Sequence, residues 1–313
     1  MAQHDNSYKL LFSDPAMVRD LLTGFVREDW VRQLDLDSLE KVSGSYVTDE
    51  LRDREDDVIW RVRWGDGWLY VYLLLEFQST VDRYMAVRVM AYEALLYQDL
   101  IRQKALTASG KLPPVLPIVL YNGEKRWTAA QNVADLVEEV PGGLVRYCPT
   151  LSYLLLDEGA VYDGAAWPKE TRNLVAALFQ LEHSQDEQQW TDLIARLGEW
   201  LKAPEHASLR RAFTVWIRRV LLPSRLPGLA SNEVDALQDL HEVHDMLAER
   251  IKQWPERWKL EGREEGREEG LEEGREETAR NMILETSMDD TMIAKLSGLE
   301  VTRVAELRRE SMD

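Results

Sequence analysis

The sequence contains a single cysteine, Cys148, among its 313 residues. One thiol cannot form a disulfide within the chain, and it excludes zinc sites built from two or more cysteines. No run of about 18 uncharged apolar residues occurs, and the first residues lack the basic start and apolar stretch of a signal peptide. These absences predict a cytoplasmic protein with no membrane partner.

Positive charge is also scarce, because 38 Lys and Arg stand against 56 Asp and Glu, for a net charge of -18. Each contact with a DNA phosphate needs a cationic side chain that displaces a counterion, so this balance argues against a protein that coats nucleic acid. It does not exclude an enzyme whose acidic residues bind a metal ion. Any DNA binding should therefore depend on a divalent ion or on a local basic face.

Hydrophobic periodicity in the first 160 residues alternates between helix and strand. Asp14-Pro15 and the apolar spacing after it predict a helix to about residue 27, preceded by His4 and Asp5 in a segment that is either ordered near a site or disordered. Gly65-Asp66-Gly67 predicts a turn between two strands. The remaining elements are a helix at 81–106 and strands at 115–121 and 151–156. This order predicts an α/β core, 1–160, with a mixed central sheet flanked by helices.

From residue 161 to residue 255 the sequence changes to amphipathic segments, which predict an all-helical domain packed on the core. Residues 256–281 contain a Gly-Arg-Glu-Glu repeat with a glycine every four residues, and 282–313 resemble a small helical hairpin spaced like a helix-turn-helix. Each interior glycine costs a helix about 0.8–1 kcal/mol relative to alanine, which favours a solvated, partly helical linker for the repeat. The alternative is a helix whose glycine face lets a second copy of the chain approach, forming a homo-oligomer.

Three polar residues lie at the ends of the two predicted hairpin strands. Asp57 opens the strand 57–64, Glu76 lies near the end of the strand 68–77, and Gln78 directly follows that strand. If residue i pairs with about 132 minus i across the turn, Asp57 lies opposite position 75, next to Glu76. Two carboxylates this close in an apolar sheet repel each other unless a cation lies between them, and Mg²⁺ is the oxygen-seeking ion that suits such a site. Asp57 and Glu76 are therefore predicted metal ligands, and the Gln78 amide is predicted to orient an attacking water.

Four stretches of sequence carry a resemblance to a known family. They are HDNSYKLLFSDPAMVRDLL at 4–22, REDDVIWRV at 54–62, LLLEFQST at 73–80 and PIVLYNGEKRWTAA at 117–130. Together with the glycine-rich tail they resemble the Rpn family of recombination-promoting nucleases, which are also described as transposases of the PD-(D/E)XK type. The resemblance implies a restriction-endonuclease-like core, Mg²⁺-dependent or other divalent-ion-dependent cleavage of DNA, and a role in recombination or mobile-element biology. Asp57, Glu76 and Gln78 fall on the motif positions, although Gln78 stands where most PD-(D/E)XK nucleases have Lys.

Several residues are candidates for supporting roles. Asp5 is a candidate additional ligand, and Arg88 and Tyr92, four residues apart on one helix, are candidates for contacting phosphate or supporting Gln78. Which acid of the run Glu55-Asp56-Asp57 binds metal stays open between Asp56 and Asp57. The most basic stretch, 209–225, supplies candidate DNA contacts, with pairing to local acids as the alternative; these contacts are Arg210, Arg211, Arg218 and Arg219.

A rival interpretation is a non-catalytic DNA-binding or assembly protein that retains a nuclease scaffold. The acidic composition, the glutamine at position 78 and the glycine repeat favour it. The two interpretations differ in one property, which is cleavage of DNA in the presence of a divalent ion.

Overall fold

The structure is a computed structural model that describes residues 2–42, 57–76, 81–123, 125–139, 142–164, 172–184, 186–226, 229 and 231–310. The chain divides into two compact units, Met1–Leu247 and Ala248–Asp313. The predicted boundaries near residues 160, 255 and 281 remain predictions.

A five-stranded sheet forms the centre of the first unit, in the order β1-β2-β3-β4-β5. The first three strands pair antiparallel, and β3, β4 and β5 pair parallel to one another, so the predicted α/β class with a mixed sheet is confirmed. The strands are β1 (Leu34–Lys41), β2 (Asp57–Trp64), β3 (Gly67–Glu76), β4 (Val115–Tyr121) and β5 (Leu154–Asp157). The sequence pattern predicted all of them except β1, whose residues LDLDSLEK carry too few apolar side chains to indicate a strand.

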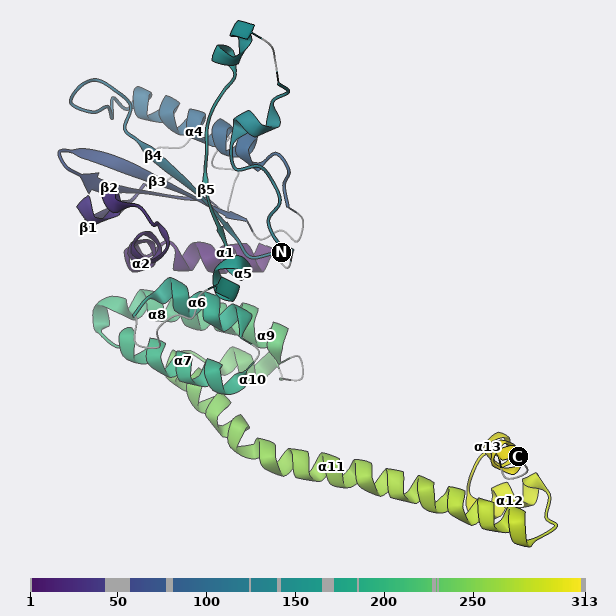
Figure 1. The fold of residues 1–313 in the computed structure, drawn as a ribbon. Helices are drawn as coiled ribbons and strands as arrows, with labels where there is room; N and C mark the ends of the chain where they lie inside the picture. Colours follow the sequence, from purple (N-terminus) through teal and green to yellow (C-terminus); the bar gives the residue numbers. More distant parts are fainter. Residues whose placement is uncertain are drawn as a thin grey trace. The chain divides into compact units, whose positions relative to one another are not determined.

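Helices cover both faces of this sheet (Figure 1). The alternate residues Val58, Trp60 and Val62 of β2 belong to a core shared with α1 (Ala2–Leu11) and α2 (Pro15–Phe25). Ile59 belongs to the opposite core, beneath α4 (Met85–Arg102). The alternative of a disordered start is wrong, since α1 forms there and buries Tyr8 and Leu11 completely. Burial of these side chains stabilises a helix that its weak amphipathic pattern did not predict.

After β5, the first unit is helical, as the apolar periodicity predicted. One hydrophobic core contains residues of both the sheet and these helices, including Leu73 of β3 and Phe213. The helices are α5 (Glu158–Gly164), α6 (Leu174–His183), α7 (Glu187–Trp200), α8 (Ala207–Trp216), the π-helical turn η6 (Ile217–Leu221), α9 (Leu222–Arg225), α10 (Ser231–Ala236) and the start of α11 (Leu240–Glu285). Short 3-10 turns are η1 (Asp29–Gln33), η3 (Val133–Leu136), η4 (Gly142–Tyr147) and η5 (Pro204–His206).

A buried asparagine joins α2 to α6. Asn173 donates from Nδ2 to the Asp20 carbonyl at 2.8 Å, and its Oδ1 accepts from the Ala176 amide at 2.8 Å as the N-cap of α6. The Asp20 carboxylate in turn accepts from the Leu174 amide at 2.6 Å. A Cβ at Gly24 would lie only 2.6 Å from Nδ2 of Asn173, so the glycine permits the helices to come this close.

Substituting two helical glycines should therefore change stability in opposite directions. Gly24→Ala should destabilise the fold by about 1–3 kcal/mol, because the added methyl displaces a buried, hydrogen-bonded Asn173. Gly198→Ala should stabilise it by about 0.5–1 kcal/mol, since a Cβ there meets open space in the interior of α7. Urea denaturation of the two variants beside the parent measures both changes. Equal effects of the two substitutions would show that the Asn173 contact does not control the packing of α2 on α6.

The second unit consists of the end of α11 packed against α12 (Asp290–Ser297) and α13 (Val301–Glu310) around a small core that includes Ala279 and Val304. Gly298 ends α12 with φ of 76°, a left-handed conformation that glycine adopts without strain. The residues of the glycine repeat lie within α11, so the repeat is helical. No helix among the described residues is long and apolar enough to cross a membrane.

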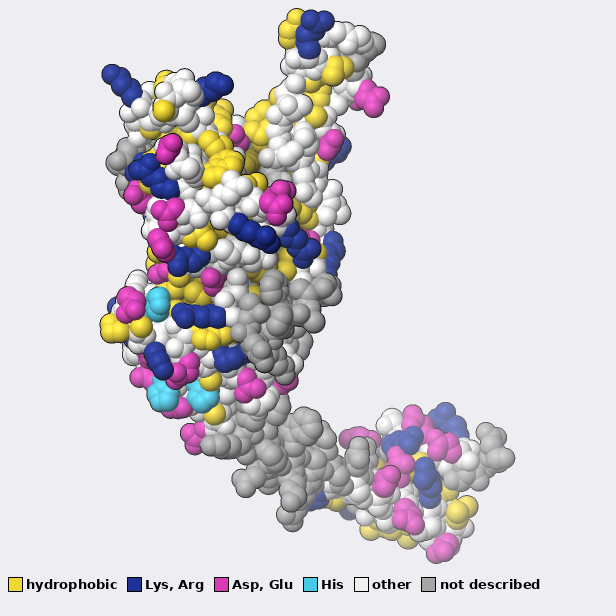
Figure 2. Space-filling view, turned by 60° about the vertical axis from the view of Figure 1, so that its left-hand side comes forward, with side chains coloured by type: hydrophobic (Ala, Val, Ile, Leu, Met, Phe, Trp, Pro, Cys, Tyr) yellow, Lys and Arg dark blue, Asp and Glu magenta, His cyan; other side chains and the backbone are white. Residues whose placement is uncertain are grey.

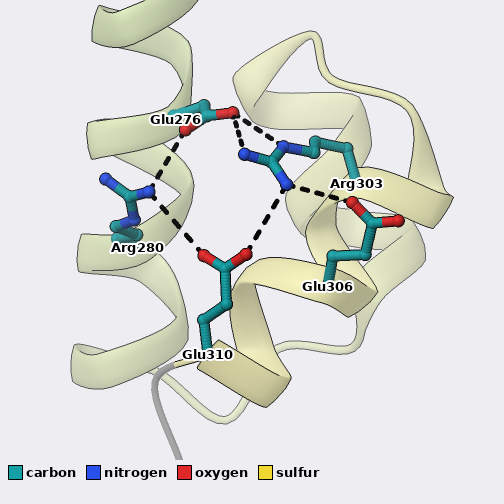
Figure 3. Close-up of polar contacts among 5 residues, drawn as sticks. All are labelled: Glu276, Arg280, Arg303, Glu306 and Glu310. Carbon is teal, nitrogen blue, oxygen red and sulfur yellow. Dashed lines mark hydrogen bonds and ion pairs between the residues drawn. The ribbon is translucent and has the colours of Figure 1, made fainter.

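Charged side chains hold α13 against α11 in this second unit (Figure 3). Arg303 donates from Nε to Glu276 at 2.7 Å and from Nη1 to Glu306 at 3.0 Å, and Glu310 lies 3.7 Å from the same nitrogen. Arg280 also pairs with Glu276 at 3.2 Å. Arg303 therefore pairs with acids of its own unit.

Candidate functional site

The hairpin of β2 and β3 closes with a two-residue turn, and this sets the register of the acidic positions. Trp64 pairs with Gly67, so the turn is Gly65-Asp66 and not the three residues that we predicted. Asp57 consequently pairs with Leu74, and the predicted pairing with position 75 is wrong by one residue. A shift of one residue moves a position to the opposite face of the sheet.

The observed register assigns positions 57, 74 and 76 to the same face of the sheet. Residues directly opposite share a face, and residues two apart on one strand share it as well. Asp57 and Glu76 are thus diagonal neighbours, a relation with Cα atoms typically about 7–8 Å apart. This is the face that α4 covers, because Ile59 and Tyr70 of the same alternation pack beneath that helix.

A row of three residues continues this edge across the parallel strands. Glu76 pairs with Tyr121 at the end of β4, and Tyr121 pairs with Asp157 at the end of β5. We call this row, together with Asp57 at the start of β2, the carboxyl edge. Tyr121 is fully buried, and its ring lies 4.9 Å from the Trp127 ring in an edge-to-face contact.

Asp157 organises the loop after β4. It accepts a hydrogen bond from the Trp127 amide at 3.0 Å and another from the Ala160 amide at 3.1 Å, while Arg126 lies 3.4 Å from Oδ1. Because both carboxylate oxygens are engaged, Asp157 fits a structural role better than that of a metal ligand. It fixes the stretch 117–130 against the sheet edge.

Tyr121 and Asp157 were not among the predicted site residues, although the sequence carries a signal for the aspartate. Both β3 and β5 end in three leucines followed by an acid, as LLLE at 73–76 and LLLD at 154–157. An acid that directly follows a buried strand needs a partner, and this criterion selects Asp157 as readily as Glu76.

The predicted pair Arg88 and Tyr92 lies on α4, the helix that covers the acidic face. Arg88 donates from Nε to the Tyr92 hydroxyl at 3.3 Å and from Nη1 to Asp82 at 3.1 Å. Tyr92 is buried, so it also contributes to the core beneath the helix. Near this group, burial raises the pKa of Tyr153 to about 12, and the Asp82 charge adds to the rise. Tyr153 therefore remains protonated at neutral pH and donates to the Ala130 carbonyl at 3.1 Å.

The structure does not describe every predicted site residue. The backbone of Asp5 lies in α1 and those of Asp57 and Glu76 lie in strands, but their side chains are outside the described parts of the chain. Gln78 and Asp56 lie outside the described residues altogether. The catalytic assignment of Asp57, Glu76 and Gln78 remains a prediction.

Two of the four candidate DNA-binding arginines are held by acids of the same chain. Arg210 donates to Asp239 at 2.8 Å and to the Leu201 carbonyl at 2.7 Å, and Arg218 contacts Asp235 at 3.1 Å. Arg211 and Arg219 are exposed. On the face seen in Figure 2, Lys and Arg side chains are interspersed with Asp and Glu and do not form one basic patch.

The fold and the site define a class of protein, namely an α/β protein with acidic residues at one edge of a mixed sheet. The chain matches the family model described as "Putative transposase, YhgA-like" over residues 2–208. The chain belongs to this family of YhgA-like transposases, and the resemblance to recombination-promoting nucleases is confirmed by its relatives.

The similar curated proteins include nucleases and an inactive relative. The chain is 33% identical over 122 residues to the recombination-promoting nuclease RpnD of Escherichia coli O157:H7, covering 39% of this chain and 46% of the relative. It is 34% identical over 121 residues to RpnA of E. coli K12, covering 38% and 40%. It is 29% identical over 161 residues to the inactive recombination-promoting nuclease-like protein RpnE of E. coli K12, covering 51% and 52%. The chain thus spans about half the length of these relatives or less, and no solved structure matches it.

Proposed function

We propose that this chain is a metal-dependent DNA endonuclease of the PD-(D/E)XK type. The observation that carries the proposal is the register of β2 and β3, in which Asp57 pairs with Leu74 and Glu76 follows two residues later. Two acidic side chains at diagonal positions on one face of a sheet can both reach the same metal ion. The relatives named recombination-promoting nucleases support DNA as the substrate.

The donor set suits a hard divalent cation, for which Mg²⁺ is the first choice. Asp57 and Glu76 would hold it through carboxylate oxygens, the ligand type that this ion prefers. A bound ion of this kind polarises the scissile phosphate, acidifies a water and stabilises the leaving oxygen. Gln78 follows Glu76 by two residues, and its amide would orient the attacking water by hydrogen bonds.

Residues outside the carboxyl edge would supply support and positive charge. Arg88 brings a guanidinium to the helix above the acidic face, where Asp82 and Tyr92 hold it at 3.1 Å and 3.3 Å. A fixed cation there would contact a substrate phosphate and offset the negative charge of the edge. Arg211 and Arg219, which are exposed, are the better candidates for contacts with the DNA backbone outside the site. Cutting of this kind would initiate recombination or the movement of a mobile element.

Cleavage of a supercoiled plasmid by the purified chain tests the proposal. Mg²⁺ should support nicking or linearisation, an excess of chelator should abolish it, and Glu76→Ala should lower the rate more than roughly 100-fold, as loss of a metal ligand requires. Retained cleavage in Glu76→Ala would remove the site assignment.

The second candidate function is a DNA-binding or assembly protein without catalysis. The relative RpnE carries the word inactive in its name, and Gln78 brings no positive charge to the transition state. No cleavage by the parent with any divalent ion, together with equal DNA binding by the parent and Glu76→Ala, would favour this function over the nuclease.

A further inference from the structure

Two histidines and an aspartate lie together near the start of α11, outside the proposed nuclease site. The helix begins at Leu240, and His241, His244 and Asp245 all belong to the first unit. Residues three and four apart are neighbours on the surface of a helix, so His241 lies beside both of the others. One ligand atom of each residue lies within 4.8 Å of the others. We call these three residues the α11 cluster.

Both imidazole rings direct a nitrogen toward the same carboxylate. Nε2 of His241 lies 3.4 Å from Oδ2 of Asp245, and Nδ1 of His244 lies 3.1 Å from Oδ1. The two rings are nearly parallel, with 7° between their planes and 6.5 Å between their centroids. Successive residues on a helix do not normally face each other, so the contact between His244 and Asp245 requires both side chains to turn toward one point. The three side chains therefore converge.

Hydrogen bonds account for this convergence less well than a shared ion does. The side chains of His241 and Asp245 are 81% and 60% exposed, and at such a surface water competes with any polar contact between them. A single exposed carboxylate needs no second imidazole. Because the rings are open to solvent, each can exchange its proton, and an ion can take the lone pair of the facing nitrogen while the proton moves to the other one.

The spacing of these atoms matches the coordination of zinc. Zn²⁺ binds imidazole nitrogen and carboxylate oxygen at about 2.0–2.2 Å in a tetrahedral arrangement, so neighbouring ligand atoms lie roughly 3.3–3.6 Å apart. The two nitrogen–oxygen distances of the α11 cluster, 3.4 Å and 3.1 Å, are close to this value. Two histidines and one carboxylate, with the fourth position open to water, are a ligand set that zinc enzymes use. An ion therefore fits among the three residues with only small rotations of their side chains.

The two histidines also line a cleft of about 480 Å³ formed by residues of α7, α8 and α11. The two cationic side chains that line it are already paired with acids. Lys202 donates to Glu199 at 2.8 Å, and Arg210 donates to Asp239 at 2.8 Å. These pairs reduce the repulsion that a bound cation would meet, and the cleft gives an ion access to the histidines from solvent.

We propose that His241, His244 and Asp245 bind one divalent transition-metal ion, with Zn²⁺ as the representative ion, at a site separate from Asp57 and Glu76. Two imidazole ligands favour Zn²⁺ over Mg²⁺, which prefers oxygen ligands. The net charge of -18 on the chain also favours the binding of a cation. The ion would link the first two turns of α11, and its exposed position makes it exchangeable.

Calorimetric titration of the full chain with Zn²⁺, after removal of metal by chelator, tests this proposal. Mg²⁺ in excess should be present throughout, so that it occupies sites made only of carboxylates. Under these conditions the parent should bind one Zn²⁺ more than the double variant His241→Ala, His244→Ala. Co²⁺ in place of Zn²⁺ should give the visible absorption bands of a tetrahedral site in the parent, and the double variant should lose them.

His206→Ala is the matched control, because it removes another histidine of the first unit whose side chain makes no cap hydrogen bond to α8. It should keep the affinity and the number of ions of the parent. Asp245→Asn removes the charge of the third ligand and keeps its shape, so it should weaken Zn²⁺ binding at least 10-fold. Without metal, all variants should melt within about 2 °C of the parent, since the substituted side chains are exposed or half-buried.

Three results would overturn the proposal. An unchanged number of bound ions and unchanged affinity in the double histidine variant would show that the α11 cluster does not bind Zn²⁺. An equal loss in His206→Ala would show that the effect follows the number of histidines and not this cluster. Loss of the ion in Glu76→Ala, with the cluster intact, would assign it to the nuclease site. Failure of plasmid cleavage would affect none of these measurements, so the two proposals are tested independently.

Discussion

Asp57→Asn is expected to lower the rate of Mg²⁺-dependent plasmid cleavage more than roughly 100-fold, while Asp56→Asn changes it less than about threefold. The reason is the register of the hairpin. Asp57 pairs with Leu74 and therefore occupies the same face as position 76. Because Asp57 belongs to the paired strand on the face of position 76, we expect it, and not Asp56, to join Glu76 at one ion. Asparagine keeps the shape of the side chain but provides a neutral, weaker ligand.

Asp56→Asn is a closely matched control, because it makes the identical chemical change one residue away and alters the net charge equally. Both variants should have the parent's melting temperature within about 2 °C, which excludes unfolding as the cause of any loss. Loss of cleavage in Asp56→Asn with activity retained in Asp57→Asn would reverse the assignment of the ligand. Equal losses in both would show that the net charge of the run, and not the register, determines activity.

Local patterns were sufficient to predict most of the sheet. Alternation in DVIWRVRW gave β2 at its exact bounds, and the run VLPIVLY gave β4. The glycines flanking Asp66 predicted the turn but not its length, because they allow a turn of two or of three residues. The length of the turn determines the register of the two strands. An error of one residue was enough to misplace the partner of Asp57.

The features that the sequence did not predict depend on contacts between distant segments. Asp157 meets Trp127 across 30 residues, and Asn173 meets Asp20 across 153. The start of the chain gave no strong helical signal for the same reason, since α1 is stabilised by residues such as Trp216 on α8.

The packing of α1 in the first unit depends on a tryptophan of α8. Tyr8 of α1 packs edge-to-face on Trp216, with ring centroids 6.3 Å apart, and both side chains are fully buried. The burial of Trp216 thus supports the helix that covers one face of the sheet. Asp5, the candidate additional ligand, lies on the same helix, three residues before Tyr8.

Trp216→Ala is expected to destabilise the first unit by about 3–5 kcal/mol, the cost of removing a large aromatic side chain from a core. The indole N–H has no hydrogen-bond partner among the described residues, so no polar contact is lost with it and the missing apolar contacts determine the effect. A unit of this size should lose at least about 6 °C in melting temperature. Calorimetry and urea denaturation measure the change.

Tyr147→Ala serves as the comparison, since that ring is 77% exposed and its removal should change stability by no more than about 0.5 kcal/mol. The tryptophan variant should also lose protection from amide hydrogen exchange in α1 before it does so in the strands, because α1 contacts α8 directly while the strands are paired with one another. A loss of less than about 1 kcal/mol in Trp216→Ala, or unchanged exchange in α1, would mean that other residues hold α1 against the sheet.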